Sequence, residues 1–163
     1  MLAALLSPTY GVYSGFEFFE NVPLEPGSEE YLNSEKYELR SRDYAAENTL
    51  MPYISQINEI RRKHPPLGRF TNLHFHSTDK DSVLAFSKTS PGADPILVIV
   101  TLNPFRWEEC TVHLDLAELR LDSSHPFEVE DLITGARYLW HGAHNYVKLD
   151  PWQEPAHIFV VRK

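Results

Sequence analysis

The chain has 163 residues, of which 42% are hydrophobic and 23% are charged, as is usual for a folded globular protein. Its net charge of −8 and the lack of a basic stripe argue against nucleic-acid binding. No apolar run approaches the ~20 residues that a membrane-spanning helix needs, and the single cysteine, Cys110, excludes an intrachain disulfide. These features favour a cytoplasmic protein.

The first third of the chain predicts a few separate elements. Residues 2–6 read as the last turns of a helix that ends at Ser7-Pro8. The aromatic run 10–16 is bounded by glycines and predicts a β-strand. Residues 17–47 are mostly polar and predict a loop, and a loop of that length in a compact domain is often functional.

A helix is predicted next, with Asn48 as its N-cap. Its apolar face is expected to consist of Leu50, Ile54, Ile57 and Ile60. The basic residues 61–63 lie at the C-terminal end, where the helix dipole favours cations. The run His64-Pro65-Pro66 ends the helix, because proline cannot continue it.

From residue 70 onward, short β-rich runs alternate with turn signals. The run 96–100 is continuously apolar, as expected for a strand buried on both faces, whereas 111–116 alternates like a half-buried strand. Regular short strands of this kind predict an antiparallel all-β sandwich. The eight expected strands are 71–77, 82–89, 96–102, 110–116, 126–132, 136–140, 144–149 and 156–162.

The early motifs resemble a known superfamily. The run Tyr10-Gly-Val-Tyr-Ser-Gly-Phe-Glu17 is similar to the eighth barrel strand of the α-amylase superfamily, and residues 54–65 are similar to its last barrel helix. More narrowly, residues 6–17 and parts of 20–43 resemble the α-1,4-glucan:maltose-1-phosphate maltosyltransferases of glycoside hydrolase family 13. These parts are Glu20-Asn-Val-Pro23, Gly27-Ser-Glu-Glu-Tyr-Leu32, Ser34-Glu-Lys-Tyr-Glu38 and Arg42-Asp43.

The resemblance covers the whole chain and implies an organisation. Residues 1–69 would be an α/β remnant, the last strand and helix of a TIM-type (β/α)8 barrel, with residues 17–47 as its substrate loop. Residues 70–163 would be the C-terminal β-sandwich domain.

The resemblance also implies a chemistry, in which maltosyl moves from maltose 1-phosphate to an α-1,4-glucan with release of phosphate. In this family an Asp nucleophile, a Glu acid/base and a second Asp support the retaining transfer. They precede the eighth barrel strand, so we expect no catalytic residue here and no transferase activity from this chain alone. No metal or nucleotide cofactor is implied. The expected partners are the missing N-terminal part of the same chain and, from the family, a second copy in a homodimer.

By the same motif match, Lys36 and Tyr37 take the role of the family pair that hydrogen-bonds the distal glucose of the maltosyl unit. The residue types fit, because lysine supplies three donors and tyrosine a hydroxyl and an aromatic face. Loops that follow barrel strands lie on the active-site face. We therefore expect a substrate-binding role for this pair.

Other charged residues of this segment have less specific interpretations. Glu17, Glu20 and Asn21 follow the predicted strand, and we expect them to brace the loop rather than contact substrate. The carboxylates of Glu29-Glu30 and Glu35 are expected to form a solvated face, not an acid/base pair.

Histidines and aromatic residues also raise alternatives. The pairs His74/His76 and His141/His144 invite a zinc site, but no CxxC or HExxH motif accompanies them, so ordinary histidines are expected. The tryptophans could stack on glucan, although packing is the more usual role of aromatics in a β-domain; they are Trp107, Trp140 and Trp152. Cys110 is expected to be structural. Without a barrel to pack against, the early aromatics should form an exposed apolar patch; they are Tyr10, Tyr13, Phe16, Phe18 and Phe19.

Two alternative functions stay open. In the first, the chain is a non-catalytic carbohydrate-binding or scaffold β-domain, and residues 70–163 fold alone; the segment 1–69 speaks against this reading. In the second, the parent enzyme is an α-amylase-type hydrolase or interconverts trehalose. The motif at 34–38 favours maltosyl phosphate instead.

Overall fold

The computed structural model describes residues 1–32 and 39–163. Its helical elements are α1 (Leu2–Leu6), the 3-10 turn η1 (Phe16–Phe18), α2 (Met51–Lys63) and the 3-10 turn η2 (Pro65–Gly68). The strands are β1 (Leu73–Thr78), β2 (Val83–Ser90), β3 (Ala93–Thr101), β4 (Glu108–His113), β5 (Pro126–Asp131), β6 (Arg137–His141), β7 (His144–Leu149) and β8 (Ala156–Arg162). All eight predicted strands are confirmed, each within three residues of its expected bounds. Helix α1 is confirmed as well.

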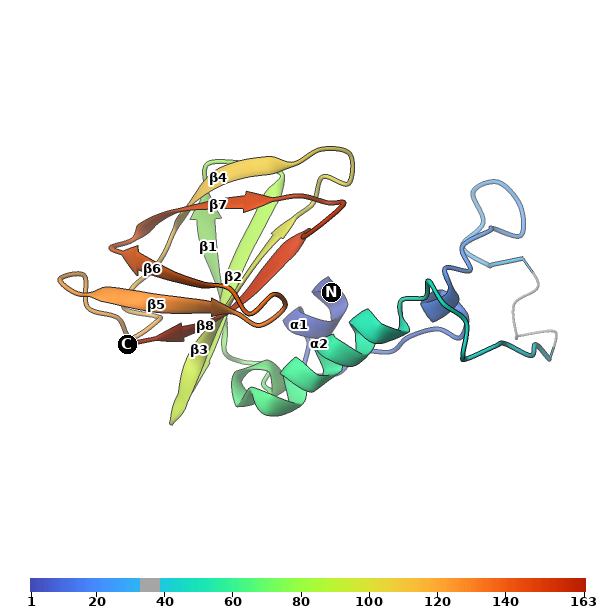
Figure 1. The fold of residues 1–163 in the computed structure, drawn as a ribbon, viewed down its shortest axis with the longest axis horizontal. Coiled ribbons are helices and arrows are strands. Elements are labelled where there is room, and N and C mark those ends of the chain that lie inside the picture. Colours follow the sequence, from blue (N-terminus) through green and yellow to red (C-terminus); the bar gives the residue numbers. More distant parts are fainter. Residues whose placement is uncertain (33–38) are drawn as a thin grey trace.

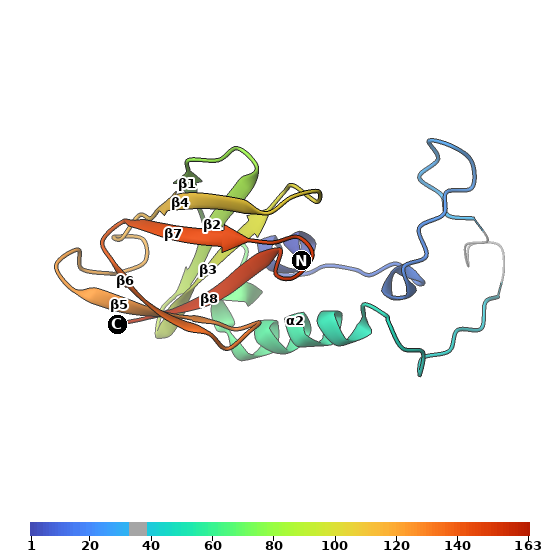
Figure 2. The same cartoon turned by 45° about the horizontal axis from the view of Figure 1, so that its top comes forward.

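The strands are hydrogen-bonded in the order β6-β5-β8-β3-β2-β1-β4-β7, and every neighbouring pair is antiparallel. The sheet folds over on itself, so that β4 and β7 lie across from β3 and β8 (Figures 1 and 2). A tight turn at Gly142 joins β6 to β7. The predicted antiparallel sandwich is therefore confirmed.

Strand β3 is buried on both faces, as its continuously apolar run predicted. Leu97 and Ile99 point into the core between the two layers, together with Phe127, Trp140 and other residues of β2, β4, β5, β7 and β8. Ile96 and Val98 point the other way, into a second core under the helices. Completely burying one such side chain stabilises a fold by roughly 1.5–3 kcal/mol, so both cores contribute to the stability of the chain.

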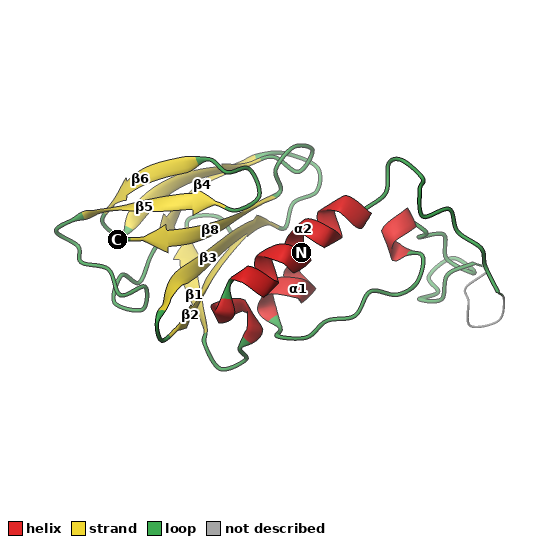
Figure 3. Cartoon of the chain, turned by 60° about the horizontal axis from the view of Figure 1, so that its bottom comes forward, coloured by secondary structure: helices red, strands yellow, loops and turns green. Residues whose placement is uncertain are grey.

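The second core is covered by α1, α2 and η2, which pack on the outer face of β2, β3 and β8 (Figure 3). Ile57 and Ile60 are the buried residues of α2, in agreement with the predicted apolar face. The predicted N-cap Asn48 is wrong. The cap position is Leu50, whose backbone N–H donates to the carbonyl oxygen of Glu17 at 2.8 Å. The start of the helix is thus set by a tertiary contact that no local pattern shows.

Helix α1 has only five residues and needs tertiary support. Two cations lie at its C-terminal end, where carbonyl groups lack helical partners. The fully buried Lys88 places its Nζ 3.4 Å from the carbonyl oxygen of Leu6, and burial lowers the pKa of this lysine. Arg61 donates to the carbonyl oxygens of Ser7 at 3.0 Å and Pro8 at 2.7 Å, which joins α1 to α2.

The strand predicted at residues 10–16 does not form. These residues are irregular up to a turn at Ser14-Gly15, after which η1 begins. A strand needs a hydrogen-bonded neighbour, and here the backbone N–H of Phe16 bonds locally to the carbonyl oxygen of Tyr13 at 3.0 Å. The composition was typical of a strand, but nothing in the described chain pairs with it.

No helix among the described residues is long and apolar enough to cross a membrane.

Candidate functional site: the loop at residues 17–47 and the contact of α2 with the sandwich

The chain between α1 and α2, which includes the predicted loop at residues 17–47, extends away from the sandwich and returns at the start of α2 (Figure 3). Its first half turns back on itself through an isolated β-bridge between Pro23 and Tyr31. The backbone N–H of Leu32 donates to the carbonyl oxygen of Val22 at 2.8 Å and extends this pairing. The predicted substrate-binding residues Lys36 and Tyr37, and Glu35, lie outside the described residues.

Glu20 joins the two flanks of the loop. Arg42 donates to both oxygens of its carboxylate, from Nε to Oε1 and from Nη2 to Oε2, each at 3.0 Å. Arg40 adds a bond to Oε2 at 3.3 Å. The hydrogen bond from Arg42 is the main reason that the pKa of Glu20 lies below its usual value. Such bidentate pairs fix geometry as well as adding energy, so residues 14–20 are held against 40–42.

Two neighbours make this clamp tight. Arg42 also donates from Nη1 to the Ser14 hydroxyl at 3.0 Å, and only 6% of its side chain is exposed. Gly15 has a φ of 99°, and a Cβ at this position would overlap the carboxylate of Glu20. Glycine is therefore required both for the backbone conformation and for the close approach of Glu20.

Glu17 closes the base of the loop. One of its carboxylate oxygens accepts the N–H of Gly15 at 3.1 Å, while its carbonyl accepts the N–H of Leu50. Glu17 and Glu20 are therefore braces, as expected from the sequence. Asn21 is exposed, and Glu29 and Glu30 lie on an exposed face of the loop.

Aromatic side chains surround the base of the loop. Tyr13, Phe16 and Phe19 are each about half exposed, which confirms the predicted apolar patch for three of its five residues, whereas Phe18 packs edge-on against Tyr44. An apolar pocket of about 260 Å³ opens among them, between α1 and α2. Tyr10 differs, because its hydroxyl donates to Oδ1 of Asn58 at 2.6 Å and the Arg61 guanidinium lies over its ring.

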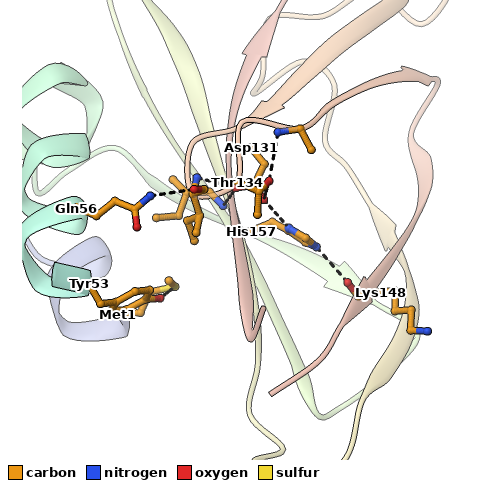
Figure 4. A network of polar contacts seen from close by, with 10 residues as sticks. Met1, Tyr53, Gln56, Asp131, Thr134, Lys148 and His157 are labelled. Carbon is orange, nitrogen blue, oxygen red and sulfur yellow. Dashed lines mark hydrogen bonds and ion pairs between the residues drawn. The ribbon is translucent and has the colours of Figure 1, made fainter. Parts of the chain in front are cut away.

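A polar network anchors α2 to the sandwich (Figure 4). Gln56 donates from Nε2 to the carbonyl oxygen of Ile133 at 2.9 Å. The N–H of Ile133 in turn donates to Asp131 at 3.1 Å, and the Thr134 hydroxyl donates to the same carboxylate at 2.9 Å. The helix thus contacts the β5–β6 turn, which Asp131 organises from its fully buried position.

His157 completes this network. Its Nδ1 lies 3.0 Å from a carboxylate oxygen of Asp131, and its Nε2 lies 3.1 Å from the carbonyl oxygen of Lys148. Because both ring nitrogens face acceptors, the imidazolium form satisfies both bonds. Burial alone would lower the pKa of His157, but the bonds to Asp131 and Lys148 raise it on balance. Burial likewise opposes ionisation of Asp131, but the hydrogen bonds from His157, Ile133 and Thr134 and the charge of His157 together lower the pKa of Asp131.

Glu154 lies near the same network, and its carboxyl is partly buried. Burial, followed by the nearby charge of Asp131, raises the pKa of Glu154 to about 7. Its Oε1 is buried without a hydrogen-bond partner among the described residues. The cluster offers no thiol or activated hydroxyl for nucleophilic chemistry. Asp131 and His157 support the β5–β6 turn that Gln56 contacts, and no nucleophile lies beside them in this cluster of described residues.

One of the two histidine pairs expected from the sequence comes together in the structure, because the rings of His74 and His76 lie with their centroids 5.0 Å apart. In the second pair, His144 lies opposite His113 of the neighbouring strand, with their Nδ1 atoms 2.6 Å apart. His76 is buried against the Ser87 hydroxyl, and burial lowers its pKa to about 4. Across the described ranges, no group of three or more His, Cys, Asp or Glu could hold a metal ion. The His113–His144 contact depends on strand register, which the sequence does not show.

The remaining single residues divide into core and surface. Cys110 is buried in the core, and burial raises the pKa of its thiol to about 11, so it is structural. Trp140 packs edge-on against Phe127 and Phe159. Trp107 and Trp152 are exposed instead.

A protein-family model described as "GLGE, C-terminal" matches residues 75–161. The chain belongs to this family. The GLGE C-terminal match falls on β1 to β8, and the similarity to curated proteins extends over the whole chain. The maltosyltransferase 2 of Streptomyces coelicolor is 48% identical over 100% of the chain, and the Mycobacterium tuberculosis enzyme is 47% identical over 97%. Both are named α-1,4-glucan:maltose-1-phosphate maltosyltransferase.

These relatives are much longer than the chain, which spans about a quarter of their length, 25% and 23% respectively. Solved structures show the same fold at low identity. A maltogenic α-amylase of Thermotoga neapolitana superposes with a TM-score of 0.63, over 93% of this chain and 33% of its own, at 13% identity. An α-amylase of Geobacillus thermoleovorans gives 0.57, over 76% of this chain and 25% of its own, at 18% identity. The GLGE C-terminal chain therefore has the fold found in part of each of these amylase structures.

Proposed function

We propose that this chain works as the C-terminal part of a maltosyltransferase that moves maltosyl from maltose 1-phosphate to an α-1,4-glucan and releases phosphate. The observation that carries the proposal is the 48% identity over the whole chain to an enzyme of that name, of which the chain spans only 25%. The nucleophile and acid/base belong to the remaining part of such an enzyme. The chain contributes binding and support, and neither a metal nor a nucleotide takes part.

In this proposal residues 17–47 are the substrate loop, and Lys36 and Tyr37 contact the distal glucose of the maltosyl unit. The clamp of Glu20 with Arg42, together with the bond from Leu50 to Glu17, supports this role. These contacts fix the two flanks between which Lys36 and Tyr37 lie in the sequence. A fixed entry and exit reduce the ordering cost when a ligand binds.

Residues 1–69 are proposed to be the end of a (β/α)8 barrel. The half-exposed Tyr13 and Phe16 and the apolar pocket of about 260 Å³ fit a surface that packs against further protein. The proposed partners are the rest of the same enzyme and a second copy in a homodimer, in the cytoplasm.

A chimera tests the proposal. The part of the S. coelicolor relative that precedes its matching quarter is joined to this chain, and phosphate release from maltose 1-phosphate is measured with a maltooligosaccharide acceptor. We expect activity from the chimera and none from the chain alone. Phosphate release by the chain alone, or a folded but inactive chimera beside an active S. coelicolor enzyme, would overturn the proposal.

Within the active chimera, Lys36→Ala and Tyr37→Phe test the loop. Each removes a hydrogen bond to the sugar, and we expect KM for maltose 1-phosphate to rise about tenfold or more with Lys36→Ala. Glu29→Ala is the matched control, because Glu29 is an exposed carboxylate of the same loop. Equal KM values for Lys36→Ala and the control would show that Lys36 does not bind maltose 1-phosphate.

A further inference from the structure

A row of side chains covers the outer face of the β4–β7 ribbon. Glu109 pairs with Lys148, Thr111 with Tyr146, and His113 with His144. Their neighbours Cys110, Val112, Val147 and Leu149 point into the core, so the row points outward. We call it the β4–β7 outer row and define it as Trp107, Glu109, His113, His144, Tyr146 and Lys148.

The members of this row contact one another. The Lys148 Nζ lies 5.0 Å from the centroid of the Trp107 ring, a cation–π contact. Tyr146 lies near Glu109 across the ribbon, and interaction with the Glu109 carboxylate raises the pKa of Tyr146. His113 and His144 are paired through their Nδ1 atoms at 2.6 Å. The row is therefore an organised surface rather than a scatter of exposed residues, yet 51% of Trp107 and 60% of Tyr146 remain exposed.

The row lies away from the helices. Helices α1 and α2 pack on the outer face of β2, β3 and β8, while β4 and β7 form the other layer (Figures 1 and 2). The main sandwich core separates the two sides. The apolar patch around Tyr13 and Phe16 is on the helix side, so protein that packs there leaves the β4–β7 outer row accessible.

We propose that the β4–β7 outer row is a second binding site for an α-1,4-glucan chain, separate from the substrate loop. The proposal rests on the proposed function for the identity of the glucan. Aromatic rings stack on the apolar face of a sugar ring, and ammonium, carboxylate and imidazole groups bond its hydroxyls. Trp107 lies four residues before Thr111, the partner of Tyr146, so the backbones of Trp107 and Tyr146 are separated by roughly 13 Å along the strands at about 3.3 Å per residue. That span suits a short run of sugars rather than one.

A second glucan-binding site away from the substrate loop would help an enzyme whose acceptor is a long polymer. Holding one part of a long glucan raises the effective concentration of its free end near the enzyme. A nucleic acid is a poor alternative occupant for a chain with a net charge of −8. A protein partner would favour a more continuous apolar surface than this mixed row of two aromatic and four charged or titratable side chains.

The test is affinity electrophoresis of the whole chain in gels with and without soluble glycogen, supported by titration with maltoheptaose. We expect glycogen to retard the chain, and Trp107→Ala with Tyr146→Ala to weaken binding about tenfold, which corresponds to roughly 1.4 kcal/mol. Phe70→Ala is the matched control, because Phe70 is 74% exposed and precedes β1 on the helix side. Thermal unfolding of each variant shows whether its fold is intact.

The outcomes separate this proposal from the proposed function. The double variant Lys36→Ala/Tyr37→Ala should bind glycogen as the unchanged chain does. If the Lys36→Ala/Tyr37→Ala variant loses retardation and the Trp107→Ala/Tyr146→Ala variant keeps it, the proposed site at the β4–β7 outer row is refuted. The proposed sugar-binding role of the loop is then supported. No retardation of the unchanged chain would also overturn it. If glycogen retards the chain only when Trp107 and Tyr146 are present, but the chimera is inactive, the glucan site at the β4–β7 outer row is supported and the proposed maltosyltransferase function is refuted.

Discussion

Arg42 and Glu20 connect two flanks of the loop that are 22 residues apart. Removing one partner of a partly buried charged hydrogen bond leaves the other without compensation. We expect Arg42→Ala to destabilise the closed base of the loop by about 1–2 kcal/mol, which multiplies local opening about 5- to 30-fold. Limited proteolysis measures this as faster cleavage within residues 21–41. Glu29→Ala is the control, and identical cleavage of both variants would show that the clamp does not hold the loop.

Glu154 gives a pH dependence with a definite sign. Its pKa is raised from 4.5 to about 7 by burial and by Asp131, so the fold favours the protonated carboxyl. This contribution is complete below about pH 4.5 and is lost as the pH rises through about 7. The pKa of His157 is also raised, so its contribution is lost in the same direction, above 6.5.

Glu154→Gln should therefore flatten the loss of stability between pH 5 and pH 8. We expect the free energy of unfolding of the variant to be on the order of 2 kcal/mol higher than that of the unchanged chain at pH 8, and equal to it near pH 4.5. Denaturant unfolding at several pH values measures the difference. Glu25→Gln, an exposed carboxyl of the loop, is the control. A parallel pH profile for Glu154→Gln and the unchanged chain would contradict the assignment.

At the scale of elements, α2 is held on the sandwich by its apolar face and by the hydrogen bond of Gln56 to the β5–β6 turn. Ile57 is 2% exposed and packs in the second core, while Gln56 reaches the β5–β6 turn. We expect Ile57→Ala to lower the free energy of unfolding by about 2–4 kcal/mol through lost burial and a cavity. Ser55→Ala, on the exposed side of the helix, should change it by less than about 0.5 kcal/mol. Similar values for the two variants would mean that α2 is not docked on the sheet.

The same scale shows which elements the sequence predicted. The periodicity of apolar residues predicted α2 and the turn signals predicted all eight strands, because these patterns reflect burial along one element. The run 10–16 was predicted wrongly as a strand, because a strand needs a neighbour and composition does not supply one. Asn48 was predicted wrongly as the N-cap, because the contact from Leu50 to Glu17 sets the helix start.

At the scale of the whole molecule, the helices and the sandwich depend on each other. Phe86, Ile96, Val98 and Ile158 lie on the sheet face that α1, α2 and η2 cover. We expect residues 70–163 alone to expose this face, to be less stable than the whole chain and to self-associate. Size-exclusion chromatography and denaturant unfolding of the two chains measure this. A monomeric fragment 70–163 of equal stability would favour the reading of a free-standing β-domain.

The sequence by itself determined the eight strands, the helix α2, the sandwich and the likeness to maltosyltransferases, because local periodicity and motifs carry that information. It also placed Glu17 and Glu20 as braces. Only the tertiary structure decided which distant residues meet: Glu20 with Arg42, Asp131 with His157, and His113 with His144. These contacts depend on strand register and on how the loop closes. Register and closure are set by the packing of whole elements, and no local pattern of residues encodes them.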